Sequence, residues 1–116
     1  NLAFAPRAEL TAPALADLLA LDDAGYREVF RGSPIKRIGR DRMMRNCLIA
    51  AGNSGSAALV GPVAALLDDP APEVRGAAVW ALRRLDAVMW AAERKARLAD
   101  EADADVRAEW LGAVVS

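Results

Sequence analysis

The chain has no histidine and only one cysteine among its 116 residues, and these shortages exclude several kinds of active site. Without imidazole, neither histidine acid–base catalysis nor histidine metal ligation is available. One thiol cannot form an internal disulfide or hold an iron–sulfur cluster, which takes four thiolates. Phosphate-binding GxxxxGK[ST] and nucleophilic GxSxG motifs are also missing. We therefore expect no catalytic, cofactor-binding or metal-binding residue in this chain.

Long hydrophobic runs are missing as well. The apolar runs at residues 18–21 and 63–67 are much shorter than the roughly 20 residues that cross a bilayer. The first ten residues, NLAFAPRAEL, lack the basic start and continuous apolar core of a signal peptide. The sequence thus predicts a cytoplasmic protein that has no membrane partner.

The amino acids that are abundant favour helices. Alanine and leucine dominate, β-branched residues other than valine are few, and 54% of the residues are hydrophobic. This composition is typical of helices rather than strands, and the length suits about one domain with its own core. We expect an all-α protein, which could also be a fragment of a larger one.

One apolar pattern occurs three times. Its copies begin at Met44, Val74 and Val106, which are 30 and 32 residues apart, and an arginine follows each of them. In every copy further apolar residues recur at helical spacing. The copies are Met44, Leu48 and Ala51, then Val74, Ala78, Ala81 and Leu82, then Val106, Trp110, Ala113 and Val114. Such recurrence predicts a short helical repeat array made of antiparallel helix pairs.

Turn signals divide the chain into about seven helices. The segments GNSG (52–55), DDPAP (68–72) and DEADAD (100–105) separate the periodic stretches. We expect Asp22 or Asp23 to cap an early helix, Pro72 to begin one, and Asp103 or Asp105 to cap the last. The expected organisation is leading helices at 1–30, a basic loop with the first repeat helix at 31–55, a second repeat at 56–86 and a third at 87–116.

The positive charge is concentrated in one segment. Residues 31–45 contain six cations and the single acid Asp41, a net charge of +5, whereas the remaining residues carry −6. The net charge of −1 conceals this division. A basic patch on an otherwise acidic chain indicates a polyanionic partner that meets one face of the protein.

Several segments together resemble a known family. GSPIKRIGR (32–40), RN (45–46), LIAAGNSG (48–55) and PEVRGAAVWAL (72–82) are similar to the C-terminal part of bacterial epoxyqueuosine reductases. The repeats themselves resemble HEAT-like repeats of the phycobilisome-lyase type. The opening Phe4, Ala5 and Glu9 resemble the residues directly after the last cluster cysteines in that family, so the resemblance implies a C-terminal fragment.

The resemblance implies a reaction that this chain cannot perform alone. Members of the family use cobalamin and two [4Fe-4S] clusters to remove the epoxide oxygen of epoxyqueuosine at the wobble position of tRNA, which gives queuosine. A catalytic region and a ferredoxin-like region carry these cofactors. The chain resembles only the helical region beyond them. Its implied partners are the tRNA anticodon arm and the enzyme's own upstream regions, and we expect a monomer.

The basic segment supplies the candidate RNA contacts. Lysine and arginine bind phosphates by displacing condensed counterions, and Ser33 and Pro34 should keep the segment from becoming helical. The candidate RNA-binding residues are Arg31, Lys36, Arg37, Arg40 and Arg42. Arg45 aligns with Arg75 and Arg107 in the repeat, and this position favours a structural role that bridges layers.

Three other kinds of residue favour a structural role over a functional one. Cys47 shares a helix face with Met44 and Leu48, so we expect a buried thiol. The three tryptophans are better placed for packing than for stacking on bases. Asn53 is expected to close its helix.

Two alternatives remain for the basic segment. The chain could be a HEAT-like adaptor that binds a protein and has no nucleic-acid role, or GSPIKR could line the cofactor pocket of the parent enzyme.

Overall fold

A computed structural model describes residues 11–32 and 39–112 of the chain. Within these ranges it contains seven α-helices and no strand, so the predicted all-α fold is confirmed. Three short 3-10 helices, at 57–59, 66–68 and 98–100, lie next to α4 and α6. The α-helices are α1 (Ala12–Leu19), α2 (Asp23–Val29), α3 (Gly39–Ser54), α4 (Val60–Ala65), α5 (Pro72–Leu85), α6 (Ala87–Arg97) and α7 (Ala104–Trp110).

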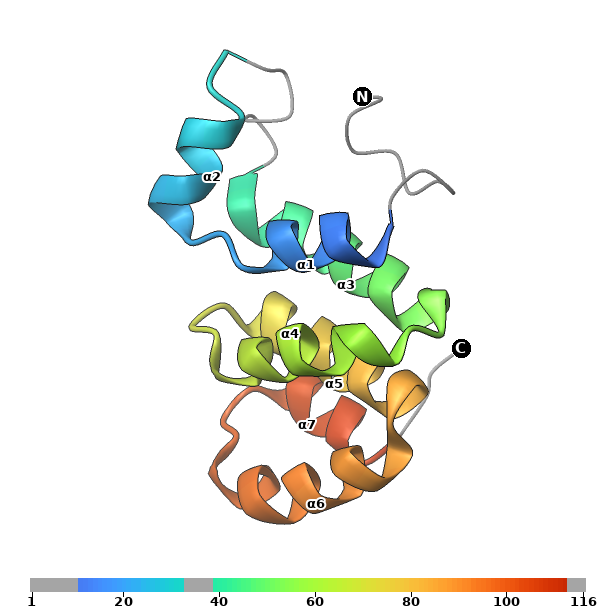
Figure 1. Cartoon of the computed structure of the whole chain (residues 1–116). Coiled ribbons are helices and arrows are strands. Elements are labelled where there is room, and N and C mark those ends of the chain that lie inside the picture. Colours follow the sequence, from blue (N-terminus) through green and yellow to red (C-terminus); the bar gives the residue numbers. More distant parts are fainter. Residues whose placement is uncertain (1–10, 33–38, 113–116) are drawn as a thin grey trace.

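The helices stack in three antiparallel pairs (Figure 1): α1 with α3, α4 with α5, and α6 with α7. Helices α1, α4 and α6 form one side of the stack, while α3, α5 and α7 run in the opposite direction along the other side. The most extensive contact is between α3 and α5, and α5 also packs on α7. Helix α2 stands at one end, beside the start of α3.

The core follows the predicted apolar stripes. Met44, Leu48 and Ala51 of α3 are fully buried, as are Val74 and Leu82 of α5. In α7 Val106 and Trp110 of the third stripe are buried, while Ala113 and Val114 lie outside the described residues. The buried residues form one continuous cluster from α1 to α7, and stacked helix pairs require such a cluster for stability.

Helix starts are fixed by the predicted residues. The Asp22 carboxylate accepts a hydrogen bond from the Gly25 amide at 2.7 Å, and Asp103 accepts from the amides of Asp105 and Val106. Pro72 occupies the first position of α5, where its missing N–H costs nothing. The expected caps and the expected proline start are thus confirmed.

Helix α3 is longer at both ends than the sequence predicts. It begins at Gly39, whose φ of +84° is a backbone conformation that favours glycine. It continues through Gly52 and Asn53 to Ser54, and Gly55 with φ +71° follows its end. The prediction that Asn53 closes the helix was wrong, because the left-handed position that ends it belongs to Gly55.

Gly52 therefore lies inside a helix, where it has a packing role. A Cβ atom on this residue would lie 2.6 Å from the Trp80 ring and 3.1 Å from the Cα atom of Ala81. The missing side chain lets α3 approach α5 closely. The GNSG segment is thus partly a helix-packing site, which its turn-like composition concealed.

Candidate nucleic-acid interface

Arg40 is a structural residue in this arrangement. Its Nε donates to the Leu21 carbonyl at 3.0 Å, and its Nη2 donates to the Asp69 carboxylate at 2.8 Å. Only 13% of the Arg40 side chain and 5% of the Asp69 side chain are exposed, and the hydrogen bond to Asp69 raises the pKa of Arg40. The expectation that Arg40 lies in an exposed loop was wrong, because the residue is in the first turn of α3 and ties three segments together.

Arg75 has the same role one layer further along the stack. It donates to the carbonyls of Asp69 and Pro70 on the loop before its own helix, at 3.0 and 3.1 Å. It also forms two bonds to the Glu101 carboxylate on the loop of the next layer, at 3.0 and 2.8 Å. These bonds lower the pKa of Glu101. The predicted bridging role of Arg75 is confirmed.

Arg107 completes this series of loop contacts, whereas Arg45 does not join it. Arg107 donates to the carbonyls of Leu98 and Glu101, at 2.8 and 3.3 Å. Arg45 is exposed and makes no hydrogen bond or ion pair with another described residue. The structural role predicted for Arg45 was therefore wrong, and in the first layer Arg40 takes that role instead.

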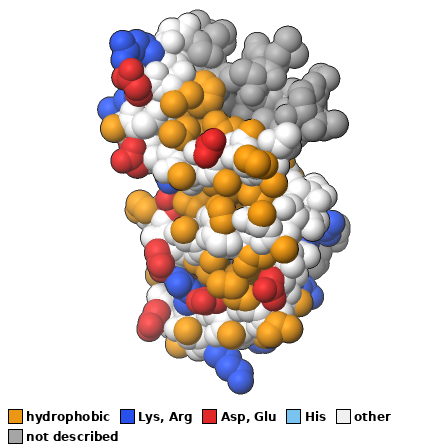
Figure 2. Space-filling model, in the orientation of Figure 1, with side chains coloured by type: hydrophobic (Ala, Val, Ile, Leu, Met, Phe, Trp, Pro, Cys, Tyr) orange, Lys and Arg blue, Asp and Glu red, His pale blue; other side chains and the backbone are white. Residues whose placement is uncertain are grey.

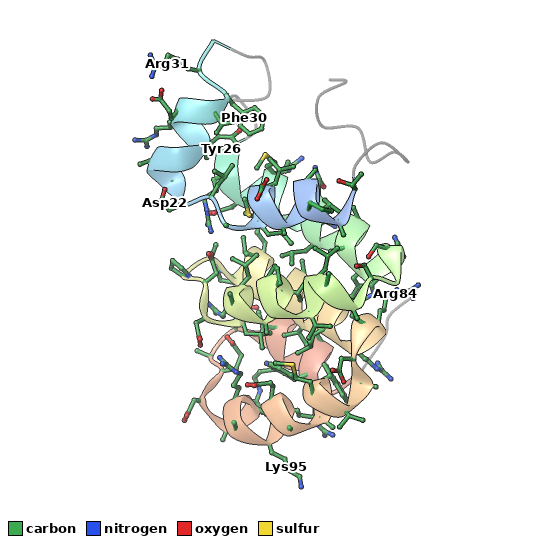
Figure 3. The ribbon with its side chains drawn as sticks, viewed as in Figure 1. Asp22, Tyr26, Phe30, Arg31, Arg84 and Lys95 are labelled. Carbon is green, nitrogen blue, oxygen red and sulfur yellow. The ribbon has the colours of Figure 1, made fainter. Side chains whose placement is uncertain are left out.

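Arg31 is exposed at the end of α2 and pairs with Glu28 one turn earlier (Figure 3). Because 68% of the Arg31 side chain is exposed, this pair contributes little to stability and can open to meet another anion. Lys36 and Arg37 lie outside the described residues. Their proposed contacts with RNA remain predictions from the sequence.

Arg42 and Arg45 are the free cations of α3. Both are exposed and neither pairs with another described residue. Arg42 lies in the first turn, where the positive end of the helix dipole makes a cation unfavourable. Helix stability therefore does not account for the charge at this position. These two arginines continue the basic segment onto a rigid element.

The side of the stack formed by α3, α5 and α7 also carries a groove of about 390 Å³. Arg45 and Ile49 of α3 line it together with Trp80 of α5 and Glu109 of α7. Trp80 is held from one side by the Arg84 guanidinium, 5.2 Å from the ring centroid. The groove thus joins a free cation, an aromatic ring and a carboxylate.

The opposite side of the stack has a different character. Figure 2 views the face over α1, α4 and α6, where hydrophobic side chains cover much of the centre and Lys and Arg lie mainly at the margins. The described residues of that face show no continuous row of cations for a phosphate backbone. The candidate interface is therefore the α3 side, whose helix follows the basic residues 31–38 in the sequence.

The described residues offer no ligand set for the [4Fe-4S] clusters that the resemblance implies. They contain no cluster of three or more His, Cys, Asp or Glu side chains that could hold a metal ion. Cys47 is 1% exposed, and burial raises its pKa to about 12, so it remains a protonated core thiol as expected. A [4Fe-4S] cluster does not fit this donor set.

Among residues 11–32 and 39–112, no helix is long and apolar enough to cross a membrane.

The sequence did not lead us to predict that Arg45 and Trp80 lie on the same face of the protein. A signal for Arg45 was present: buried Met44 and Leu48 place residues 42, 45 and 49 on the other side of the same helix. Trp80 carried no such signal, because its position beside α7 and Arg45 depends on how the layers stack.

Comparison with known proteins gives a consistent set of relatives. The chain is 38% identical over 87 residues to the epoxyqueuosine reductase of Alicycliphilus denitrificans, a match that covers 68% of this chain and 24% of that protein. It is 28% identical over 105 residues to the Bacillus subtilis epoxyqueuosine reductase, covering 90% and 27% respectively. With the Yersinia pestis epoxyqueuosine reductase it shares 45% identity over 51 residues, 44% of this chain and 12% of that protein.

The chain thus spans about a quarter or less of the length of these curated relatives. No family model and no solved structure matches it. The agreement among relatives from several bacteria nevertheless points to one family, the one that the sequence motifs indicated. The chain belongs to the epoxyqueuosine reductases and corresponds to the C-terminal portion of those proteins.

Proposed function

We propose that this chain is the HEAT-like, tRNA-binding region of an epoxyqueuosine reductase. It holds the anticodon arm while regions elsewhere in the enzyme, which bind cobalamin and two [4Fe-4S] clusters, reduce epoxyqueuosine to queuosine at the wobble position. The main supporting observation is that Arg42 and Arg45 are exposed and unpaired among the described residues, directly after a basic segment in an otherwise acidic chain.

The chemistry of this surface suits phosphate binding. RNA affinity comes largely from cations that release condensed counterions, and Arg31, Lys36, Arg37, Arg42 and Arg45 supply five of them. Arg40 contributes indirectly. Its bonds to Leu21 and Asp69 fix the first turn of α3, so Arg42 is presented from a rigid backbone.

A protein-binding adaptor is the competing interpretation. The exposed large hydrophobic residues among those described are Val29 of α2, Val88 of α6 and Leu111, which follows α7. Specific protein interfaces contain a buried apolar centre. The hydrophobic side chains over α1, α4 and α6 (Figure 2) would supply one only on the side of the stack opposite Arg42 and Arg45, which are unpaired among the described residues. Charge therefore favours RNA as the partner.

The α3 arginines can be tested by neutralising them singly. We expect Arg42→Gln and Arg45→Gln each to weaken tRNA binding and to reduce the slope of log K against log[salt] by about 1, the loss of one phosphate contact. Binding is measured by fluorescence anisotropy with labelled tRNA at several salt concentrations.

Lys95→Gln is the matched control. Lys95 is exposed and lies at the opposite end of the stack from Arg31 (Figure 3), so this variant should bind tRNA as the parent chain does. If folded Arg42→Gln and Arg45→Gln variants kept the parent slope, the α3 surface would not be the phosphate site. Recovery of a protein partner that tRNA cannot displace would support the adaptor instead.

A further inference from the structure

The groove between α3, α5 and α7 has a composition that phosphate contact alone does not explain. Arg45 and Ile49 come from α3, Glu73 and Trp80 from α5, and Glu109 from α7. The groove is open to solvent, and its volume of about 390 Å³ lies within the range of small-molecule sites, about 300–1,000 Å³. A site of this size suits a single nucleotide.

Trp80 is a fixed surface in this groove. Its ring rests against Gly52, where even a methyl group would approach to 2.6 Å, and the Arg84 guanidinium lies over it. The Arg84 Nε in turn donates a hydrogen bond to the Gly52 carbonyl oxygen at 3.2 Å. The part of the ring that lines the groove can stack on a base with little ordering cost, because its neighbours already set its position.

The residues that line the groove one turn before Trp80 on α5 have small side chains. Gly76 and Ala77 line it between Trp80 and α7, and a Cβ on Gly76 would meet nothing closer than Val106 at 3.8 Å. A planar group can therefore lie along α5 against the indole. Bulky side chains at these two positions would have filled the same space.

Charge is divided across the groove. Arg45 provides a cation on the α3 side, whereas Glu73, Asp105 and Glu109 provide carboxylates on the α5 and α7 side. Glu73 and Asp105 form no ion pair with another described residue. Burial raises the pKa of Glu109, and the charge of the nearby Arg83 opposes this rise.

We propose that this groove binds one unpaired guanine nucleotide of the tRNA. The phosphate lies toward Arg45, the base stacks on Trp80, and the Glu109 carboxylate accepts the two adjacent N–H groups of the guanine edge. This inference rests on the proposed tRNA binding and adds a base-specific contact to it.

Guanine fits better than the other bases because its Watson–Crick edge presents two neighbouring donors to one carboxylate. Single-stranded RNA is commonly read on this edge by side chains while the base stacks on an aromatic ring. Uracil has a single N–H on that edge, and this N–H lies between two carbonyl groups. The three nearby carboxylates would repel the oxygen atoms of these carbonyl groups. The same carboxylates disfavour a phosphate-lined duplex against α7.

Nuclear magnetic resonance of the ¹⁵N-labelled chain tests this inference, with guanosine 5′-monophosphate, uridine 5′-monophosphate and inorganic phosphate as probes. We expect guanosine monophosphate to shift the indole resonance of Trp80, which Trp80→Phe identifies, and the amide of Gly76. Glu109→Gln should weaken guanosine monophosphate binding at least fivefold, the lower end for a bidentate base contact, and leave uridine monophosphate binding unchanged. Glu28→Gln, on an exposed part of α2, is the matched control.

The possible outcomes separate the two proposals. Intact tRNA binding with no nucleotide effect on Trp80 would overturn the guanine site and leave the tRNA role standing. Loss of both would overturn both. Shifts in the groove caused by an arginine-rich peptide but not by any nucleotide would identify the groove as a protein site and contradict the inference.

Discussion

Replacing Asp69 with alanine is expected to lower the free energy of unfolding by about 3–5 kcal/mol, the cost of leaving a buried charge without its partner. The Asp69 carboxylate accepts hydrogen bonds from Arg40 and from the Ala71 amide at 2.8 and 3.0 Å. Arg40 is too enclosed to recover this loss from solvent, because only 13% of its side chain is exposed. Urea unfolding followed by circular dichroism measures the change.

The neighbouring residue provides the control. Asp68 pairs with Arg97, but 75% of its side chain is exposed, so Asp68→Ala should cost about 1 kcal/mol or less. The double variant Arg40→Met/Asp69→Ala should lose less than the sum of its single changes, because no unpaired charge remains. A cost for Asp69→Ala as small as that for Asp68→Ala would contradict the structural role of Arg40.

Replacing Gly52 with alanine is expected to destabilise the protein by about 3 kcal/mol, near the upper end for overpacking. The new methyl group would lie 2.6 Å from the Trp80 ring and 3.1 Å from the Cα atom of Ala81. A backbone atom cannot move away as a flexible side chain can, so α3 and α5 must separate. Thermal unfolding measures the loss.

Gly76→Ala is the comparison that isolates this clash. Gly76 also lies inside a helix, but its added methyl group would meet Val106 at an ordinary 3.8 Å. Since alanine is favoured over glycine in helices by about 1 kcal/mol, Gly76→Ala should leave stability unchanged or raise it. If both variants gained stability, the close packing of α3 on α5 at Gly52 would be incorrect.

Much of the fold was predictable because local chemistry determines it. The apolar stripes beginning at Met44, Val74 and Val106 are buried, and Asp22 and Asp103 cap helices where their spacing indicated. These features depend on helical period and on neighbours within one turn. Neither needs knowledge of how the layers stack.

The failures lie where distant segments meet. Gly52 was interpreted as a turn residue because the reason for its presence, the Trp80 ring, lies on another helix. Arg40 was interpreted as an RNA contact because its partner, Asp69, is on a later loop. Arg45 was then assigned the structural role that belongs to Arg40. A pattern of charges along the sequence shows which residues are cationic, but it does not show which cations are already paired.

The sequence indicated which segment carries the candidate site, but not which of its cations are available to a ligand. The excess charge in residues 31–45 located the surface, and the structure divides it into bound and free cations. Arg40 is held, Arg31 is weakly paired, and Arg42 and Arg45 are free among the described residues. Trp80 and Glu109 joined this surface through helix stacking, which the sequence alone does not encode visibly.

The most direct test of tRNA binding is the salt dependence of the parent chain's affinity for tRNA, beside that of a folded Lys36→Glu/Arg37→Glu variant. Contacts with about five phosphates predict that log K falls against log[salt] with a slope of about −4, and that the variant has both a smaller slope and a much lower affinity. Absence of tRNA binding by the folded parent chain, or a variant that binds as tightly with the same slope, would contradict it.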